Sequence, residues 1–300
     1  MNYKKIFKSR SLRFRILKAL SWIPDKIMLR IQYKIQTGHT LNLKNPKRFT
    51  EKIQWYKINY KNDLMLQCAD KYEVRKYVSS KGLDDILIPL IGIYDNLDLQ
   101  ILERLPNRFV LKTTDGGGGE QVYICRDKSK IDINTLLASA IKWKNIKRIN
   151  AGREWAYQSP YKSRYIVEDL IGADEADLID YKFLCFNGEP YCLYAISERI
   201  LGLNAQLGIY DMNFNKLPVE DLAERTQKKL PKPINFDKMV EIAKILSSEF
   251  PHVRVDLYNI SGKIYFGELT FYDSSGYIKF NPDKFDFELG NQFFINNIKI

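Results

Sequence analysis

Two acidic side chains near the C-terminal end of the chain have the spacing of a metal site. Asp256 lies in the alternating run 253–257, and Glu268 lies in the run 264–271, which follows after a short loop. Alternation of apolar and polar residues predicts the two strands of a hairpin, so both acids share its polar face. Two neighbouring carboxylates repel each other unless a cation lies between them, and Mg²⁺ prefers such oxygen ligands. The pair predicts a magnesium site, and a solvated strand face with a cross-strand ion pair is the alternative.

The loop length of this hairpin decides which side chains meet. A three-residue loop, 260–262, would place Arg254 opposite Glu268 and make Asp256 a diagonal neighbour of Glu268. Thr270 shares the same face and offers a hydroxyl oxygen. Arg254 can stabilise negative charge that develops on a reacting oxygen. The expected cluster therefore combines two carboxylates, a hydroxyl and a guanidinium.

A run of consecutive glycines is the second feature that could do chemistry. It consists of Gly116, Gly117, Gly118 and Gly119. The run follows a predicted strand, 108–113, that carries Lys112, and a second predicted strand, 121–125, follows it. Glycine backbones expose N–H groups that can surround an anion. Because the lysine precedes the glycines and a strand follows them, the run is neither a Walker A loop nor a Rossmann turn. It predicts either a phosphate-binding loop or a flexible hairpin tip.

Two further lysines gain meaning only from their neighbours. Lys71 follows Asp70, and Lys182 lies two residues after Asp180. Taken alone, each is typical of a solvent-exposed lysine. Together with the glycine run and the C-terminal hairpin, however, they form an ordered series of charged residues.

The order and spacing of this series resemble those of the ATP-grasp superfamily. The chain has, in turn, a lysine in an Asp-Lys pair, a strand-borne lysine before a glycine-rich hairpin, Glu168 at the end of a β run, and Arg-x-Asp and Glu-x-Thr on a final hairpin. The chain is similar at a finer level to the teichuronopeptide-biosynthesis (TupA-like) branch, in segments 49–55, 69–75, 152–155, 180–183 and 253–271. The resemblance covers about residues 20 to 290.

The resemblance implies a nucleotide-binding role for several residues. Lys71 and Lys112 would hold the α and β phosphates of ATP, and the glycine run would cover the β and γ phosphates. Glu175 would take the ribose. The hinge that meets adenine would consist of Glu168, Asp169 and Leu170.

The same resemblance implies the metal ligands and the catalytic residues. The ligands of Mg²⁺ would be Asp256, Glu268 and Thr270, although the superfamily usually has Asn at the position of Thr270. Arg254 would polarise the acyl group, and Lys182 is the second catalytic candidate.

The elements that must position these residues divide the chain into three predicted parts. Residues 1–70 form a basic helical segment, 71–165 a subdomain with the glycine-rich lid, and 166–300 a subdomain with the adenine hinge and the metal site. The resemblance implies an α+β chain with the ATP-grasp fold, in which two β-rich palms enclose ATP. Helical spacing predicts helices within 3–24, 25–36, 49–77, 134–146 and 236–250. Predicted strands are 108–113, 121–125, 164–168, 181–186 and 190–196, and Asn187-Gly188 favours a tight hairpin turn.

The positive charge of the chain is confined to its first part. The net charge is +11 overall, but residues 1–62 hold 16 Lys and Arg against 2 acids, a net of +14. The other 238 residues have a net charge of −3. This distribution indicates a basic segment that contacts an acidic glycan or an anionic membrane face, and it does not favour a nucleic-acid-binding protein.

Composition and hydropathy indicate where in the cell the protein is expected. The 4 cysteines form no Cys-x-x-Cys pair and there are 2 histidines, so neither a zinc site nor a disulfide framework is favoured. Apolar runs are too short for a membrane span, and bases interrupt the N-terminal apolar region where a signal peptide needs its centre. We therefore expect a cytoplasmic protein, with contact at the inner membrane face.

The resemblance implies an ATP-dependent carboxylate-amine ligase. Its expected substrates are the uronic acid carboxylate of a bacterial surface polysaccharide or its precursor and an amino acid or other amine, joined through an acylphosphate. Arg153, Arg199 and the basic segment are candidates for binding the acidic glycan. A glycosyltransferase of the same kind of pathway is the alternative, but the chain has no Asp-x-Asp triplet to hold a sugar-nucleotide metal. A nucleic-acid or membrane-binding module is a further alternative, which leaves the acid pair unexplained.

Overall fold

The structure is a computed structural model that describes residues 15–17, 19–117, 121–144, 150–158, 160–172, 178–197 and 206–298. Most of the basic helix predicted over 3–24 lies outside these residues. Four candidate site residues lie outside them as well: Gly118, Gly119, Glu175 and Arg199.

The first part of the described chain is helical, as predicted. Its helices are α3 (Asp25–Thr37), α4 (Phe49–Asn59), α5 (Asp63–Ala69) and α6 (Val74–Ser80). Gly38 ends α3 in a left-handed conformation, φ 86°, and its N–H donates to the carbonyl of Lys34. Glu51 begins α4 by accepting the backbone N–H groups of Lys47 and Arg48. The buried face of α4 packs on the main core of the molecule through Phe49, Ile53 and Tyr56.

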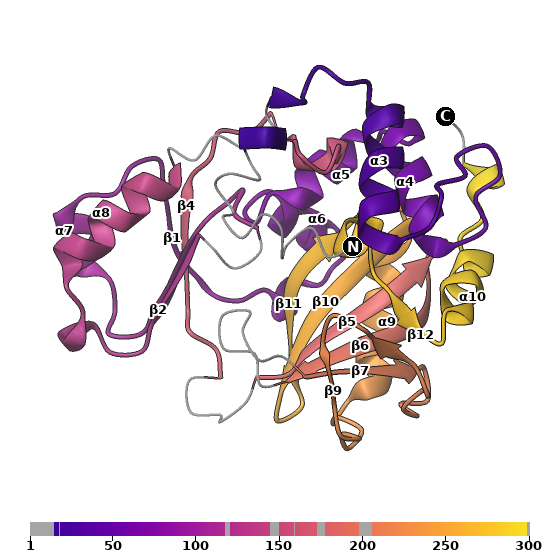
Figure 1. Cartoon of the computed structure of the whole chain (residues 1–300). Helices are drawn as coiled ribbons and strands as arrows, with labels where there is room; N and C mark the ends of the chain where they lie inside the picture. The colour runs from indigo at the N-terminus through magenta and orange to yellow at the C-terminus, as the bar shows by residue number, and fades with distance from the viewer. Residues whose placement is uncertain are drawn as a thin grey trace.

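A four-stranded antiparallel sheet follows, on the left of Figure 1. Its strands are β1 (Leu90–Tyr94), β2 (Phe109–Thr113), β3 (Val122–Cys125) and β4 (Tyr165–Glu168), in the order β1-β4-β2-β3. Helices α7 (Leu99–Arg104) and α8 (Ile133–Lys144) cover one face and share a hydrophobic core with the sheet. Because β4 pairs with β1 and β2, this sheet reaches Glu168, three residues beyond the predicted boundary at 165, and the boundary stays a prediction.

A six-stranded sheet contains most of the second half of the chain, in the order β11-β10-β5-β6-β7-β9. Its strands are β5 (Asp180–Phe186), β6 (Glu189–Ser197), β7 (Gln206–Asp211), β9 (Arg225–Thr226), β10 (His252–Ile260) and β11 (Lys263–Thr270). Helix α9 (Phe236–Ser247) packs on β5, β6 and β10. All residues of β5 are buried, as expected for an inner strand covered on both faces. Asn187 and Gly188 form the predicted tight turn, with φ of 51° and 81°.

The remaining elements are short. A two-stranded sheet joins β8 (Glu220–Asp221) to β12 (Phe280–Asn281), and α10 (Lys284–Gln292) follows β12. Single 3-10 turns are η1 (Asp84–Ile86), η2 (Lys128–Lys130), η3 (Trp155–Tyr157), η4 (Asp273–Gly276) and η5 (Ile295–Asn297). Mixed helices and sheets confirm the predicted α+β class. None of the helices in the described ranges combines the length and apolar character needed to cross a bilayer.

The register of the hairpin β10–β11 corrects the sequence prediction. The loop has two residues, Ser261 and Gly262, with φ of 51° and 92°, instead of three. A bulge at Gly267 then shifts the register once more, so Asp256 lies directly opposite Glu268 and not diagonal to it. A Cβ atom at Gly267 would lie 3.0 Å from the Asp256 carbonyl oxygen. The shorter loop and the bulge each shift the register by one residue. Glu268 and Thr270 therefore stay on the predicted face with Arg254 and Asp256, although the predicted opposite pairs are wrong.

Candidate active site

Three charged side chains form a row across neighbouring strands of the six-stranded sheet. Lys182 on β5 lies opposite Asp256 on β10, and Asp256 lies opposite Glu268 on β11. Lys182 Nζ donates to the Asp256 carboxylate and, at 2.6 Å, to Asp180. Side chains at matching register positions point to the same face, so the sheet itself holds this row in place.

Arg254 connects the row to a second set of acceptors. Its Nε and Nη2 lie 2.7 and 2.8 Å from the two carboxylate oxygens of Asp256. Nη2 also lies 3.2 Å from Glu268 Oε1 and 3.1 Å from Thr270 Oγ1. Nη1 donates to Asp273, on the turn that follows β11. The predicted face of Arg254, Asp256, Glu268 and Thr270 is thus a connected hydrogen-bond network.

The two opposed carboxylates differ in exposure and in proton affinity. Asp256 is buried, and this burial raises its pKa to about 6 against the attraction of Arg254 and Lys182. Glu268 has a side chain 49% exposed. Desolvation alone would raise the pKa of Glu268, but the positive charges of Lys182, Arg254 and Lys71 lower it to about 2. Glu268 therefore presents an ionised, accessible carboxylate beside a buried one.

The residues of this face fit a divalent cation. Asp256 and Glu268 bring two carboxylates together, and Thr270 Oγ1 lies 3.1 Å from Glu268 Oε1. Mg²⁺ is commonly held by one or two carboxylates plus phosphate and water. Within the described ranges, no group of 3 or more His, Cys, Asp or Glu residues could hold a metal by itself. The site thus has the donors for a metal that shares its coordination with a phosphate.

Lys71 lies in the turn between α5 and α6. Its backbone N–H donates to Thr114 O, 2.9 Å away, and its Nζ donates to the Gly116 carbonyl, so it is attached to the loop that follows β2. Its charge is also one of those that lower the pKa of Glu268. Lys71 is therefore attached to the beginning of the glycine run, and its charge acts on Glu268. The phosphate roles of these residues stay predictions. Gly116 and Gly117 lie within the described residues, and Gly117 is exposed. Gly118 and Gly119 lie outside them.

Lys112 and Glu168 form an ion pair with each other. Lys112 Nζ lies 2.6 Å from Glu168, and Arg75 lies 3.2 Å from the second oxygen of the same carboxylate. Each carboxylate oxygen of the buried Glu168 therefore has a basic partner. The N–H of Asp169 donates to Pro89 O at 3.0 Å. An adenine contact at Glu168, Asp169 and Leu170 would therefore use other backbone groups, and this hinge stays a prediction.

The two charged clusters have opposite net charge. Around Asp256 there are four acids, Asp180, Asp256, Glu268 and Asp273, against two bases, Lys182 and Arg254. Around Glu168 there are the two bases Lys112 and Arg75. An excess of negative charge suits a divalent cation, and an excess of positive charge suits a phosphate.

Sequence reasoning missed three members of these clusters. Asp180, two residues before Lys182, and Arg75, four residues after Lys71, lie inside segments that carried the resemblance, and their charge was an available signal. Asp273 lies beyond β11, and its carboxylate also accepts from the Tyr194 hydroxyl at 3.3 Å. Only the folded turn brings Asp273 to Arg254, and the sequence carries no periodic signal for it.

Arg153, a candidate for glycan binding, has other partners in the structure. Its guanidinium donates to the carbonyls of Leu20, Ser21 and Ile23 and to the Asp25 carboxylate, at 3.0 to 3.2 Å. The side chain is only 12% exposed. Arg153 therefore connects its loop to the chain that leads into α3.

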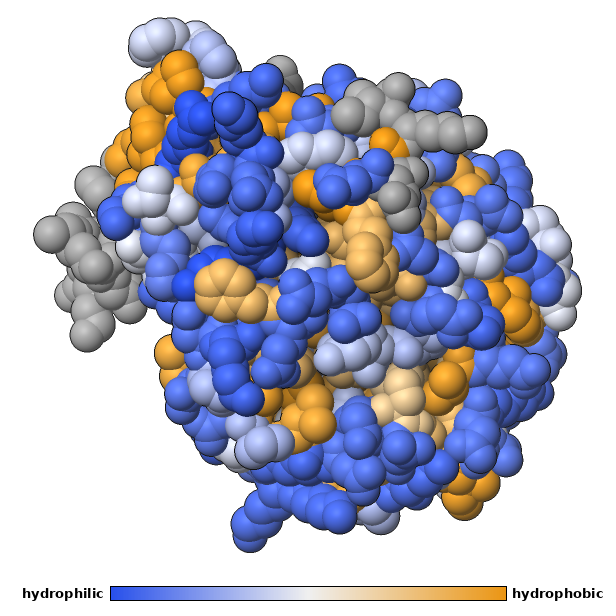
Figure 2. All heavy atoms as spheres, turned by 90° about the vertical axis from the view of Figure 1, so that its right-hand side faces the viewer, coloured by the Kyte–Doolittle hydropathy of each residue, from blue (hydrophilic) through white to orange (hydrophobic). Residues whose placement is uncertain are grey.

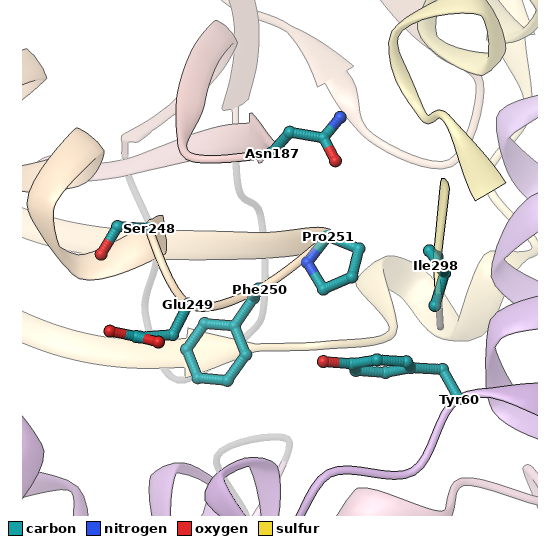
Figure 3. A pocket seen from close by; sticks show the side chains of 7 residues that line it. All are labelled: Tyr60, Asn187, Ser248, Glu249, Phe250, Pro251 and Ile298. Atoms are coloured by element: carbon teal, nitrogen blue, oxygen red, sulfur yellow. The ribbon is translucent and has the colours of Figure 1, made fainter. Parts of the chain in front are cut away.

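A surface cavity of about 390 Å³ lies at the other end of the six-stranded sheet (Figure 3). Its lining residues are Tyr60, Asn187, Ser248, Glu249, Phe250, Pro251 and Ile298. Asn187 lies five residues after Lys182, roughly 16 Å along an extended strand. The cavity contains none of the candidate site residues.

Comparison with known proteins identifies the class and then the family. The class is that of the ATP-grasp proteins, as predicted. The chain belongs to the TupA-like ATP-grasp family, whose model matches residues 51–294. The family resemblance predicted from the sequence is thereby confirmed.

Solved structures with a similar fold are distant in sequence. D-alanine–D-alanine ligase from Bacillus anthracis, complexed with ATP, is 14% identical with a TM-score of 0.42, over 68% of this chain and 55% of that chain. The enzyme of the same name from Helicobacter pylori is 16% identical with a TM-score of 0.42, over 75% and 61%. D-cycloserine synthetase DcsG is 13% identical with a TM-score of 0.43, over 77% and 70%. This chain spans less than two thirds of the length of both D-alanine–D-alanine ligases. No curated protein matches the chain.

Proposed function

We propose that this protein is an ATP- and Mg²⁺-dependent carboxylate-amine ligase. The carboxylate substrate is the uronic acid of a bacterial surface polysaccharide or of its precursor, and the amine is an amino acid or a related compound. Family membership supports the reaction class, because ATP-grasp enzymes join a carboxylate to an amine through an acylphosphate.

The observation that carries the proposal is the direct opposition of Asp256 and Glu268 beside Lys71. The two opposed acids could hold a cation, and the charge of Lys71, the lysine proposed to bind phosphate, acts on Glu268. MgATP needs both, since the cation and the phosphate chain bind as one unit. A site for carbohydrate alone would not need two directly opposed carboxylates.

In the first step, an oxygen of the substrate carboxylate attacks the γ-phosphorus of ATP. A new P–O bond forms, the bond between the γ-phosphorus and the bridging β-γ oxygen breaks, and ADP leaves. Bound Mg²⁺ would supply charge neutralisation for this transfer. In this proposal Lys71 and Lys112 would hold phosphate oxygens, which would align the reacting groups without proton transfer by the protein.

In the second step, the amine nitrogen attacks the acyl carbon. The C–N bond forms, the bond from the acyl carbon to the phosphate oxygen breaks, inorganic phosphate leaves, and the amine proton passes to the solvent. Arg254, fixed by Asp256 and Asp273, can stabilise the negative charge on the acyl oxygen. This step needs no histidine in the reacting position.

The test measures ADP and phosphate release by the purified protein with ATP, MgCl₂, a uronic acid and a panel of amino acids. Turnover that requires both substrates, with an amide product detected by mass spectrometry, is the expected result. Glu268→Gln and Asp256→Asn should each lower turnover by about 100-fold or more, the usual loss for a group that stabilises transition-state charge.

Glu189→Gln is the matched control for these variants. Glu189 lies on the same sheet with a side chain 67% exposed, in an ion pair with Lys244. Its turnover should equal that of the wild type. Full ATP consumption by the Asp256→Asn and Glu268→Gln proteins would exclude the proposal, as would turnover of a nucleotide sugar without ADP release.

A further inference from the structure

Helix α3 presents two different faces. Met28, Leu29 and Tyr33 are buried, and Tyr33 donates to or accepts from the Thr50 hydroxyl of α4 at 2.7 Å. This inner face attaches α3 to the protein beside α4 (Figure 1). The outer face is therefore held in a fixed orientation toward the solvent.

Three isoleucines occupy the outer face of α3. Ile27, Ile31 and Ile35 are 49%, 45% and 47% exposed. Because residues four apart lie one above the other on a helix, they form a continuous apolar stripe. Trp22, which precedes the helix, is 78% exposed. Exposed apolar side chains of this size are normal when single, but a stripe of them indicates an interaction surface.

A row of bases runs beside the isoleucine stripe. Lys26, Arg30 and Lys34 each precede one isoleucine and are exposed. At about 100° per residue, the bases fill one half of the outer face and the isoleucines fill the other half. The acid of α3, Asp25, is paired with Arg153 at its first turn. The outer face therefore combines apolar and positive surface without a competing carboxylate.

We propose that the outer face of α3 docks on an anionic lipid bilayer. The isoleucines would enter the boundary between headgroups and acyl chains while the bases contact acidic headgroups, which is the composition of helices that lie in a membrane interface. Trp22 belongs to the residue types enriched at that depth. In Figure 2, hydrophilic residues cover most of the face shown and hydrophobic ones gather in separate patches. The adjacent apolar and basic rows of α3 differ from single apolar side chains scattered over a surface.

Two other occupants fit the charges less well. A symmetric contact between two copies of α3 would bring the two rows of bases together, and like charges repel. A nucleic acid would contact the bases but would gain nothing from the isoleucines. The inference does not depend on the proposed ligase activity, since it uses no residue of the candidate active site.

The test is cosedimentation of the full chain with vesicles of phosphatidylglycerol and phosphatidylcholine, compared with vesicles of phosphatidylcholine alone. We expect binding to the acidic vesicles only. Raising the ionic strength from about 0.1 M to about 1 M should weaken it, because the screening length falls from about 10 Å to about 3 Å. The triple variant Lys26→Gln, Arg30→Gln and Lys34→Gln should bind about 100-fold more weakly, at about fivefold per base.

The isoleucine stripe is tested by Ile27→Ser, Ile31→Ser and Ile35→Ser together, which should weaken binding by about tenfold or more. Leu222→Ser with Ile234→Ser, at positions 62% and 64% exposed, is the apolar control. Lys142→Gln, Lys228→Gln and Lys238→Gln, all exposed, form the charge control. Both controls should bind like the wild type, and circular dichroism should show that every variant is folded.

Three outcomes would overturn the inference. The first is unchanged vesicle binding by both α3 triple variants. The second is a loss with the base variants but none with the isoleucine variants, which would indicate general attraction to polyanions, including RNA. The third is a dimer in size-exclusion chromatography that the isoleucine variants break, without any vesicle binding.

Discussion

The two charged clusters of the molecule are built in different ways. On the six-stranded sheet, Lys182, Asp256 and Glu268 hold their places through strand register, and their network is mostly buried. On the four-stranded sheet, Glu168 is held between Lys112 of β2 and Arg75 of α6, both 17% exposed. The first cluster has an excess of acids and the second an excess of bases. A nucleotide that carries a divalent cation would complement both at once.

Removing the central lysine of the buried cluster should have the largest effect. Lys182→Met takes away the cation that Asp180 and Asp256 share. Breaking a buried ion pair from one side costs about 3–5 kcal/mol, because a charge stays buried without compensation. Equilibrium unfolding in guanidinium chloride would measure the loss of unfolding free energy. A loss below about 1 kcal/mol, the range of exposed pairs, would mean that water reaches the cluster.

His252, on the same strand β10 as Asp256, is a buried group whose protonation affects stability. His252 donates from Nδ1 to the Cys185 carbonyl, and its Nε2 has no hydrogen-bond partner among the described residues. Burial lowers the pKa of His252 to about 4 from an ordinary 6.5. The unfolded chain therefore binds the proton first, and the contribution of His252 to stability is lost as the pH falls from 6.5 toward 4.

At pH 5 this loss should amount to about 2 kcal/mol relative to pH 8. His252→Phe keeps a ring of similar shape beside Phe186 and cannot bind a proton. Between pH 8 and pH 5 the unfolding free energy of the wild type should thus fall by about 2 kcal/mol more than that of the variant. A difference that stays constant from pH 8 to pH 4 would contradict the buried, neutral state of His252.

Asp273 tests whether the position of Arg254 matters for the reaction. Asp273→Asn weakens a charge-assisted hydrogen bond to Nη1 but leaves Asp256 in contact with the guanidinium. We expect kcat to fall by about tenfold, equal to about 1.4 kcal/mol, while KM for ATP stays unchanged. An increase in KM with unchanged kcat would assign Asp273 to nucleotide binding instead.

The smallest stability effect is expected on the four-stranded sheet. Lys112→Met leaves Glu168 in contact with Arg75, so the unfolding free energy should fall by about 1 kcal/mol or less. KM for ATP should rise if Lys112 contacts phosphate, as proposed. A stability loss equal to that of Lys182→Met would remove the contrast between the two clusters.

Local sequence determined most of the elements. Alternation in 253–257 and the Asn187-Gly188 turn require only nearest neighbours in the chain, so the strands and the hairpin were predictable. The charged positions were also predictable in kind, because Asp, Glu and Lys at family spacing indicate an ATP site before any contact is known. The two register shifts between β10 and β11 add to an even number, so Glu268 and Thr270 stayed on the predicted face with Arg254 and Asp256.

Tertiary structure alone decided which charges meet. Gly267 forms a bulge that puts Asp256 opposite Glu268, and a turn beyond β11 brings Asp273 to Arg254. Lys112 was predicted to face phosphate, yet it pairs with Glu168, since β2 and β4 are neighbours in the sheet. Side-chain contacts across 50 or more residues depend on strand order and on burial, which no local pattern encodes. The sequence by itself thus determined most of the elements, the family and the types of charge, and the folded sheets determined how those charges are paired.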